Sequence, residues 1–340
     1  MEQKKKEKFH LDLSDMGIVI ALFLLLALLI ATNQTFRSLV IYRSILKTAA
    51  IYGVLGVGMS YAIIACDIDL SVGAQMALLS VIFTAIAETA GLSCSLATVA
   101  ILLMGILLGT LNGLLIAKLH IPAFMATLGT QYAFRSLAQM VNSHPVITEN
   151  EAFLAFSKAK FLEFPLTFWL MVIVVILGTL LLRRTRPGRF TLAIGNSKEA
   201  AKVSGINVSN TQLFVFIFIG LVTAIAALMG TARNASSNYG NFVSYEFTVI
   251  TAVVLGGTSM AGGKGSIITT AVACVFISIL LSAMPMYGIN TYVQKIIQGG
   301  VMILAFSINT IRRAMNHISV RSRARKALRQ RLSEEETVSV

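Results

Sequence analysis

The chain has 340 residues, of which 56% are hydrophobic and 13% are charged, and its formal net charge is +13 at pH 7. This apolar content exceeds what one soluble core of this length can bury, which excludes an ordinary soluble domain. Charged residues gather at the two ends and in one central loop, and the segments between them are long and apolar, as membrane spans require. We therefore expect an all-α polytopic membrane protein whose positive charge reports its orientation rather than a nucleic-acid partner.

The apolar segments predict about ten transmembrane helices, with a count of eight or nine left open by one short segment and two segments that carry polar residues. They divide the chain into an N-terminal tail (1–15), a transmembrane domain (16–311) and a basic C-terminal tail (312–340). The expected spans cover residues 16–32, 45–66, 70–90, 96–119, 122–141, 166–182, 211–232, 245–256, 266–284 and 291–311.

The placement of Lys and Arg gives the expected orientation. With ten spans and a cytoplasmic N-terminus, the KKKEK segment, Lys118, the RRTRPGR segment, Lys264 and the basic tail all lie in the cytoplasm. Both termini are therefore expected to be cytoplasmic, with the tail against the anionic lipid of the inner leaflet or a partner protein. The longest outward loop, 142–165, is polar enough to form a small external cap.

The central cytoplasmic loop (183–210) carries the pattern of a short helix. Asn196 is followed three residues later by Glu199, as in a capping box, and Gly205 provides a stop. The pattern predicts a helix of about eight residues, about 12 Å long. Because isolated helices this short are marginal, we expect it to dock on the span ends or on a partner. A solvated connector is the alternative.

Four residues lie where the second predicted span ends and the third begins: Asp67, Asp69, Ser71 and Gly73. Carboxylates and hydroxyls at such a position cap free backbone N–H groups, and the glycine permits a tight turn. We expect Asp69 to position the third helix. The alternative is a polar gate or a sugar contact, since ionisable groups at membrane depth are often functional.

Arg135 and Glu246 both fall near the outer ends of their predicted spans. Each is costly to bury alone, so the sequence favours an ion pair between them, or one with Arg233, and an outer gate is the alternative. Amides elsewhere in the spans either line an aqueous path for a polyhydroxylated solute or join helices by hydrogen bonds. The amides that we consider as path candidates are Asn112, Gln131, Asn142, Gln294 and Gln298.

The segment GGTSMAGGKGS invites comparison with a phosphate-binding loop. That loop needs Ser or Thr directly after its lysine, but Gly265 follows Lys264, and both flanks are predicted spans. We therefore expect an inner turn between the eighth and ninth spans, in which glycines allow a sharp reversal and close helix approach. The glycines concerned are Gly256, Gly257, Gly262 and Gly263.

Motifs for catalysis or metal binding are not found. The sequence contains no HExxH, no Cys/His metal spacing and no nucleophile elbow, and the four histidines lie in tails or loops. The three cysteines are expected to be small buried hydrophobic residues. We therefore expect no catalytic residue and no metal site. An ion-coupled secondary transporter, which needs ionisable residues clustered at membrane depth, is a less favoured alternative.

Four motifs resemble those of permeases from ribose-type ATP-binding-cassette sugar importers. They are DIDLSVGA from Asp67, IPAFMATLGTQYAFRSLA from Ile121, KEAAKVSGINVS from Lys198 and AVVLGGTSMAGGKGS from Ala252. The resemblance extends from about residue 45 to about residue 305 and keeps the motifs in order.

This resemblance implies a multi-pass permease of the bacterial inner membrane that works with three kinds of partner. These are a cytoplasmic ATPase that binds the ATP, so that this chain needs no cofactor, an extracytoplasmic sugar-binding protein, and a second permease subunit, either identical or a close paralogue. It places the ATPase-coupling helix at 197–204. The coupling residues are then Ser197, Glu199, Ala200, Ala201 and Gly205. The sugar is not specified, and nucleosides or sugar-derived signals stay open as solutes.

Overall fold

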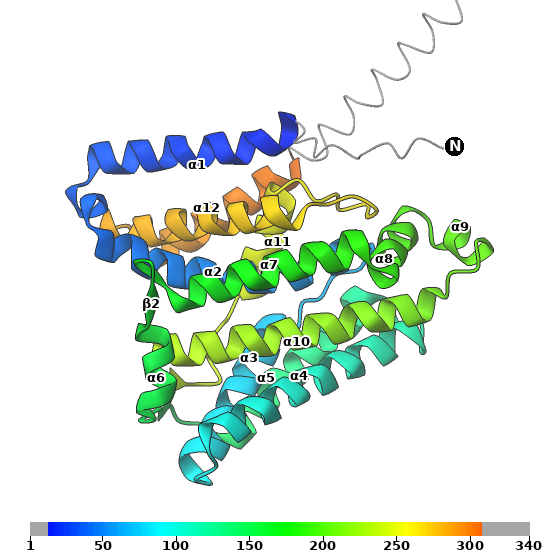
Figure 1. The fold of residues 1–340 in the computed structure, drawn as a ribbon, viewed down its shortest axis with the longest axis horizontal. Coiled ribbons are helices and arrows are strands. Elements are labelled where there is room, and N and C mark those ends of the chain that lie inside the picture. The colour runs from blue at the N-terminus through cyan, green and yellow to red at the C-terminus, as the bar shows by residue number, and fades with distance from the viewer. Residues whose placement is uncertain (1–12, 308–340) are drawn as a thin grey trace, which may run out of the picture.

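The computed structural model describes residues 13–307, and these residues form a bundle that is almost entirely helical (Figure 1). The basic tail predicted at 312–340, nearly all of the N-terminal tail and the end of the tenth span lie outside the described residues. The α-helices are α1 (Leu13–Thr32), α2 (Leu39–Ile64), α3 (Val72–Thr84), α4 (Cys94–Ala117), α5 (Ala123–Val141), α6 (Glu151–Lys158), α7 (Leu166–Arg184), α8 (Arg186–Asn196), α9 (Lys198–Val203), α10 (Val208–Asn234), α11 (Tyr245–Leu255) and α12 (Ile267–Met286). Residues 291–307 form one further helix.

Each of the ten predicted spans contains a helix of the structure. Five helices are long and apolar enough to cross a membrane by length and composition, namely α2, α4, α7, α10 and α12, and shorter apolar helices occur at Gly17–Thr32, Val72–Glu88 and Tyr245–Leu255. Together they confirm a polytopic membrane protein.

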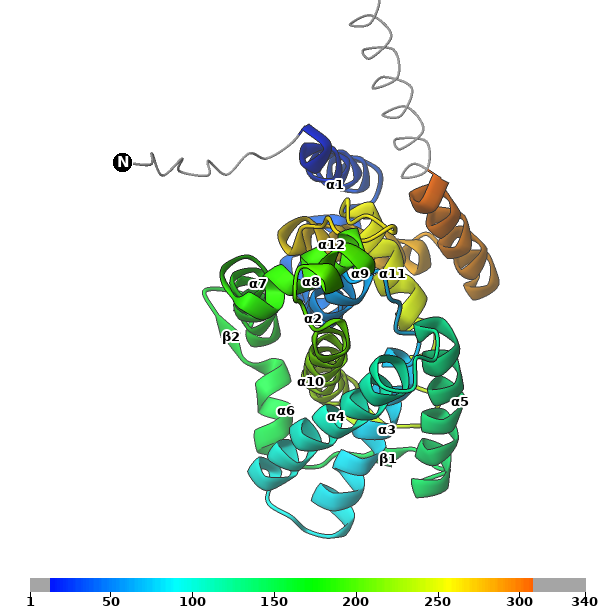
Figure 2. The same cartoon turned by 90° about the vertical axis from the view of Figure 1, so that its right-hand side faces the viewer.

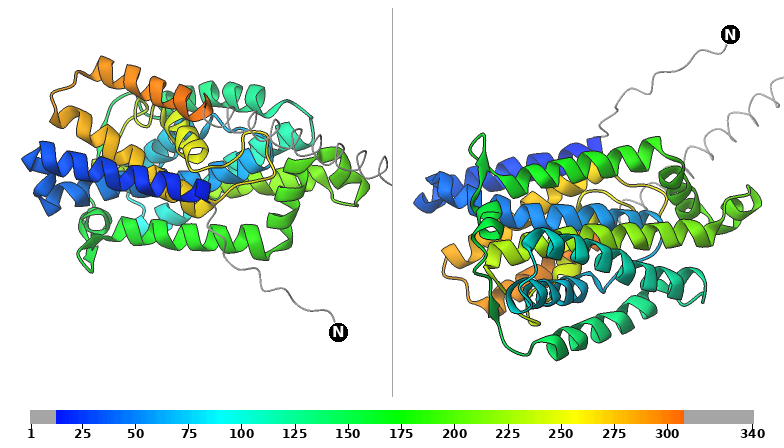
Figure 3. Two further views of the ribbon diagram at one scale, coloured as in Figure 1. Left: turned by 90° about the horizontal axis from the view of Figure 1, so that it is seen from above. Right: turned by 60° about the horizontal axis from the view of Figure 1, so that its bottom comes forward.

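Helix α10 occupies the centre of the bundle. It packs against α2, α3 and α4, while α12 packs against α2, α7 and α11. Figure 2 shows α10 between a group that contains α2, α7 and α12 and a group that contains α3, α4 and α5. Figure 3 shows α1 along the outside of the bundle, where it contacts α12.

The contact between α4 and α10 is made by glycines that the sequence analysis overlooked. A Cβ added at Gly109 would lie 2.9 Å from the Cα of Gly220, and one added at Gly105 would lie 2.6 Å from the Gly220 carbonyl oxygen. Gly105, Gly109 and Gly113 repeat at intervals of four residues, which is the spacing that lets membrane helices approach closely. This repeat could have predicted the close contact from the sequence.

Two helices are too short to cross a membrane, and both correspond to predicted spans. At 1.5 Å per residue, the 13 residues of α3 and the 11 of α11 extend about 20 and 17 Å, against an apolar thickness of about 30 Å. A π-helical turn, η2 (Ala85–Thr89), continues α3, so the apolar helix over Val72–Glu88 covers most of the span predicted at 70–90. The first two residues of that span belong to a non-helical connector, 65–71.

The outward loop predicted at 142–165 forms a small folded cap at the end of the bundle opposite α9 (Figure 1). It contains α6 and three short strands, β1 (Val146–Ile147), β2 (Lys160–Phe161) and β3 (Phe164–Pro165). Strand β1 pairs antiparallel with β4 (Ser236–Ser237), which follows α10, and β2 pairs with β3. The cap is thereby joined to the central helix. A 3₁₀ turn, η1 (Gln34–Arg37), connects α1 and α2 at the same end.

Candidate coupling site and polar path

Helix α9 is the short loop helix that the sequence predicts, with a different N-cap. Ser197 is the cap, since its Oγ accepts a hydrogen bond from the Ala200 N–H at 3.1 Å. Asn196, the expected cap, is instead the last residue of α8. Its side-chain amide donates to the Leu192 carbonyl at 2.8 Å. Helix α9 consequently has six residues rather than about eight.

The C-terminus of α9 has the geometry that Gly205 predicts. Gly205 has φ +80°, its N–H donates to Lys202, and the Ile206 N–H donates to Ala201, which together form a Schellman motif. At the other end, the N–H of Glu199 and the hydroxyl of Ser197 donate to the Glu199 carboxylate, and these hydrogen bonds lower the pKa of that exposed carboxyl.

Helix α8 precedes α9, and the sequence analysis assigned its residues to a loop. Its start follows ordinary rules, since the Thr185 hydroxyl accepts from the Gly188 N–H at 3.3 Å and Pro187 occupies the first turn. Thr185 and Pro187 could have predicted the start of α8, but the RRTRPGR segment was used only to predict the membrane orientation. Helices α8 and α9 together make the end of the molecule opposite the cap (Figure 1).

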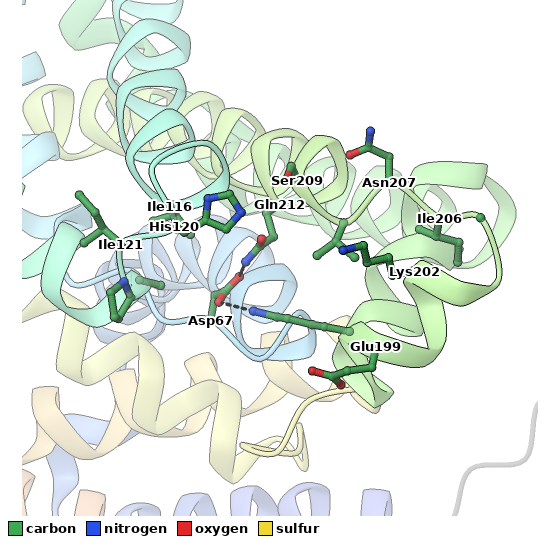
Figure 4. Close-up of a pocket in the computed structure, with 15 residues that line it drawn as sticks. Asp67, Ile116, His120, Ile121, Glu199, Lys202, Ile206, Asn207, Ser209 and Gln212 are labelled. Carbon is green, nitrogen blue, oxygen red and sulfur yellow. Dashed lines mark hydrogen bonds and ion pairs between the residues drawn. The ribbon is translucent and has the colours of Figure 1, made fainter.

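Asp67 lies between the end of α2 and the candidate coupling segment, by which we mean α8 and α9 together (186–203), and it is buried. Its Oδ1 accepts an ion-paired hydrogen bond from Lys198 Nζ at 3.2 Å, and its Oδ2 accepts from Gln212 Nε2 at 2.7 Å (Figure 4). A buried carboxylate is costly without such partners. The prediction that Asp67 caps a helix is not supported by these contacts, because both partners are side chains of α9 and α10. Lys198 and Gln212 were not identified from the sequence.

Asp69 lies at the start of α3, as expected. Its Oδ1 accepts from the Ser71 N–H at 2.8 Å and from the Ser71 hydroxyl at 2.6 Å, and Asn112 donates to the same hydroxyl at 2.8 Å. The Thr127 hydroxyl of α5 accepts from the Leu70 N–H at 3.1 Å. Asn112 is fully buried, so in this structure it joins α4 to the connector.

Gly73 allows the starts of α3 and α11 to meet inside the bundle. A Cβ at this position would overlap the Glu246 carboxylate and would lie 2.6 Å from the Phe242 carbonyl oxygen. Gly73 has an ordinary helical backbone, so the requirement for glycine here comes from the close approach alone.

The predicted ion pair between Arg135 and Glu246 is not formed in the described part of the chain. Arg135 Nη1 donates to the backbone carbonyls of Tyr239 and Asn241, at 2.5 and 2.6 Å, in the loop between α10 and α11. Glu246 instead accepts from Gln131 Nε2 at 3.2 Å. Loop carbonyls therefore satisfy the guanidinium that the sequence analysis assigned to the carboxylate. The alternative pair with Arg233 is not formed within residues 13–307 either.

Two of the path amides reach α11 from neighbouring helices. Gln131 belongs to α5, and Gln298, in the helix over 291–307, donates to the Thr248 hydroxyl at 2.5 Å. Both side chains belong to half-buried residues, whereas Glu246 is 2% exposed. Figure 2 shows α5 and the helix over 291–307 on the same side of the molecule.

The glycine-rich segment forms the turn between α11 and α12 that the sequence predicts. Gly257, Gly262 and Gly263 have φ of +89°, +80° and +72°, values that favour glycine. The Ser259 N–H donates to the Lys264 carbonyl within the turn. The turn also contacts α2, since the Gly263 N–H donates to the Ile64 carbonyl at 2.9 Å.

A cavity of about 740 Å³ opens beside α9, between the start of α10 and the loop that precedes α5 (Figure 4). Charged groups of both signs line it: Asp67, Glu199, Lys198 and Lys202. Its remaining lining is Ile116, His120, Ile121, Pro122, Ala123, Gly205, Ile206, Asn207, Val208, Ser209 and Gln212. The cavity therefore lies between the candidate coupling segment and the adjacent ends of α4, α5 and α10.

Comparison with known proteins shows which family the chain belongs to. A model of the family described as "branched-chain amino acid transport system / permease component" matches residues 41–306. The chain is 34% identical to the ribose import permease protein RbsC of Haemophilus influenzae, over 84% of this chain and 90% of that protein. It is 32% identical to RbsC of Escherichia coli K12, over 86% and 92%.

A third relative carries a different sugar in its name. The chain is 30% identical to the galactose/methyl galactoside import permease protein MglC of Haemophilus influenzae, over 92% of this chain and 98% of that protein. No solved structure gives a significant match.

Proposed function

Because the chain belongs to this family of transport-system permease components, we propose that it is the permease subunit of an ATP-driven importer that brings a monosaccharide into the cytoplasm of a bacterium. The observation that carries the proposal is the similarity to sugar import permeases over 84–92% of the chain. The capped helix α9, tied to the bundle by a buried carboxylate, supports an ATPase-coupling role.

A sugar is favoured over an amino acid as the solute. The family description names branched-chain amino acids, but the relatives named above are ribose and galactose permeases. The half-buried amides Gln131 and Gln298 and the hydroxyl of Thr248 suit a polyhydroxylated solute, because each can exchange one hydrogen bond for another with a sugar hydroxyl.

The proposed topology has ten membrane segments with both termini in the cytoplasm. It is supported by the positive residues near α8 and α9 and by the folded cap at the opposite end. Single cysteines at His120 and Ile147 test it with a membrane-impermeant thiol reagent in intact cells. We expect labelling at 147 and none at 120 until the cells are opened, and the reverse pattern would contradict the orientation.

The proposed assembly pairs two permeases through α5 and the helix over 291–307. Large side chains on these two helices are exposed, with Met140 81%, Tyr292 77% and Tyr132 72% exposed, and the same two helices carry Gln131 and Gln298. A cysteine at Tyr132 should form a cross-linked dimer with a short bifunctional reagent, and one at Leu103 of α4, also exposed, should not. Equal cross-linking at both sites would contradict this interface.

Uptake tests the function directly. Vesicles that contain the permease, its ATPase and its binding protein should take up labelled ribose or galactose in an ATP-dependent manner, and should not take up leucine. An ionophore that collapses ion gradients should leave the rate unchanged. Leucine uptake would show that the solute is an amino acid. Uptake that needs an ion gradient but no ATP would refute the proposal of an ATP-driven importer.

A further inference from the structure

The coupling segment is attached to the membrane bundle at two points that meet at the inner end of α2. The first is electrostatic. Lys198, the first residue of α9, binds Asp67 at 3.2 Å, and the same carboxylate binds Gln212 of α10 at 2.7 Å. The Asp67 side chain is 6% exposed and the Lys198 side chain is 38% exposed. One buried carboxylate therefore joins α9 to the central helix.

The second point is a backbone contact. Gly195, at the end of α8, packs so closely on α2 that an added Cβ would overlap the Ile64 carbonyl and lie 2.6 Å from the Gly263 nitrogen. The Gly263 N–H donates to that carbonyl at 2.9 Å, and a Cβ at Gly262 would lie 2.6 Å from the Gly195 carbonyl oxygen. Three segments thus meet without intervening side chains, which leaves little room for independent movement.

The connector 65–71 leads from these contacts to the interior. Asp67 is two residues before Asp69, whose carboxylate fixes the start of α3. The start of α3 in turn contacts Glu246 of α11 through Gly73. The Cys66 and Asp67 N–H groups donate to the Ile63 and Ala62 carbonyls, so the backbone of Asp67 is fixed to the end of α2. The Asp67 side chain makes the hydrogen bonds that join this fixed point to α9 and α10.

Resting on the proposed function, we propose that Asp67 is the positioning residue that transmits movement of α9 to α3 and α10. The close backbone contacts of the glycines at 195, 262 and 263 hold the end of α8 fixed against α2 during this movement. Asp67 touches neither the ATPase nor the solute in this scheme. Its loss should leave ATP hydrolysis running while transport declines. Loss of an ATPase-docking residue would instead lower both rates together.

The first test measures the attachment without any solute. Backbone hydrogen exchange of residues 198–203 is followed for the full-length permease in lipid nanodiscs. Asp67→Asn and Lys198→Met should each speed exchange about tenfold, the lower end for a charge-assisted hydrogen bond because Lys198 is partly exposed. Exchange in the double variant should be no faster than in either single variant, since each single variant already removes the same Lys198–Asp67 contact. Lys198→Arg should stay within about twofold of wild type.

Glu163→Gln is the matched control, because it neutralises the exposed carboxylate of the ion pair between Glu163 of the cap and Arg43 of α2. It should change nothing at residues 198–203. Unchanged exchange in Asp67→Asn, or additive effects in the double variant, would overturn the attachment. The exchange rates do not depend on which solute the permease carries, so this test stands apart from the proposed function.

The second test measures coupling in vesicles that also contain the ATPase and the binding protein, with ribose as the probe. Asp67→Asn should lower ribose uptake per ATP hydrolysed at least fivefold and keep the hydrolysis rate within about twofold of wild type. Unchanged uptake per ATP would overturn the transmitting role, as would an equal fall of both rates. Absence of ribose uptake by the wild type would instead count against the proposed solute, and the same ratio would then be measured with galactose.

Discussion

Replacement of Gly220 by alanine should destabilise the permease, because α10 crosses α4 with almost no space between the two backbones. A Cβ at position 220 would lie 2.9 Å from the Cα of Gly109 and would overlap the Gly105 carbonyl oxygen. Both obstacles are backbone atoms, which cannot rotate away as the end of a side chain can. The two helices must therefore separate along a contact that lies at the centre of the bundle.

The magnitude follows from two opposing effects. Overpacking by one methyl group costs about 1–3 kcal/mol, and a backbone obstacle favours the upper half of that range. The higher helix propensity of alanine offsets about 1 kcal/mol. The expected net loss is about 1–2 kcal/mol, which lowers the unfolding midpoint by about 2–4 °C at about 2 °C per kcal/mol for a large domain.

The midpoint is measured by heating detergent-solubilised protein and quantifying the folded fraction by size-exclusion chromatography. Gly17→Ala in α1 is the matched control, because no atom outside its own helical surroundings lies within 4 Å of the added Cβ. Its midpoint should stay constant or rise. If Gly220→Ala melts at or above the wild-type temperature, the glycine contact between α4 and α10 does not stabilise the fold.

Three further variants test the coupling helix and the polar path. Gly205→Ala forces alanine to φ +80°, which costs about 1–2 kcal/mol, and should weaken ATPase binding to the permease in nanodiscs at least fivefold. Ser197→Ala removes the N-cap of α9 at a cost of about 1 kcal/mol and should weaken ATPase binding about fivefold. Asn196→Ala should weaken it less, and a larger effect of Asn196→Ala would mean that Asn196 is the N-cap. The charge-exchange variant Arg135→Glu/Glu246→Arg should take up sugar no faster than either single variant, because Arg135 binds loop carbonyls and not Glu246. Faster uptake by the double variant would show that the two residues form an ion pair.

The helices could be predicted because long apolar runs leave the backbone few alternatives in a membrane. The start of α3 was predictable for a local reason, since Asp69 binds a residue only two positions away. The N-cap of α9 was not, because Asn196 and Ser197 are both good caps. Tertiary contacts decide between them, and Asn196 lies against Gly263 of the turn between α11 and α12.

The partners of Asp67 lie beyond what local sequence patterns can predict. Lys198 and Gln212 are 131 and 145 residues away along the chain, and neither has a motif that names its partner. The error over Arg135 has a related cause. Matching of opposite charges ignores backbone carbonyls, which the loop after α10 presents to the guanidinium group.

The two short helices explain where the polar residues at membrane depth are used. A helix that starts inside the bundle leaves backbone N–H groups that need partners there. Asp69 and Thr127 accept from the N–H groups of Ser71 and Leu70, which directly precede α3, and Asn112 binds the Ser71 hydroxyl beside them. These groups hold the fold together and are not free for a solute.

The half-buried Gln131 and Gln298 are the amides that we propose for the solute path, and each already holds one hydrogen bond, to Glu246 and to Thr248. A sugar that passes them can only exchange hydrogen bonds one for one, which gives little net affinity. Weak contacts are what a permease needs when a separate binding protein captures the solute, because a tight site would slow release into the cytoplasm. Gln131→Ala and Gln298→Ala should therefore change the rate of ribose uptake more than the ribose concentration that half-saturates it.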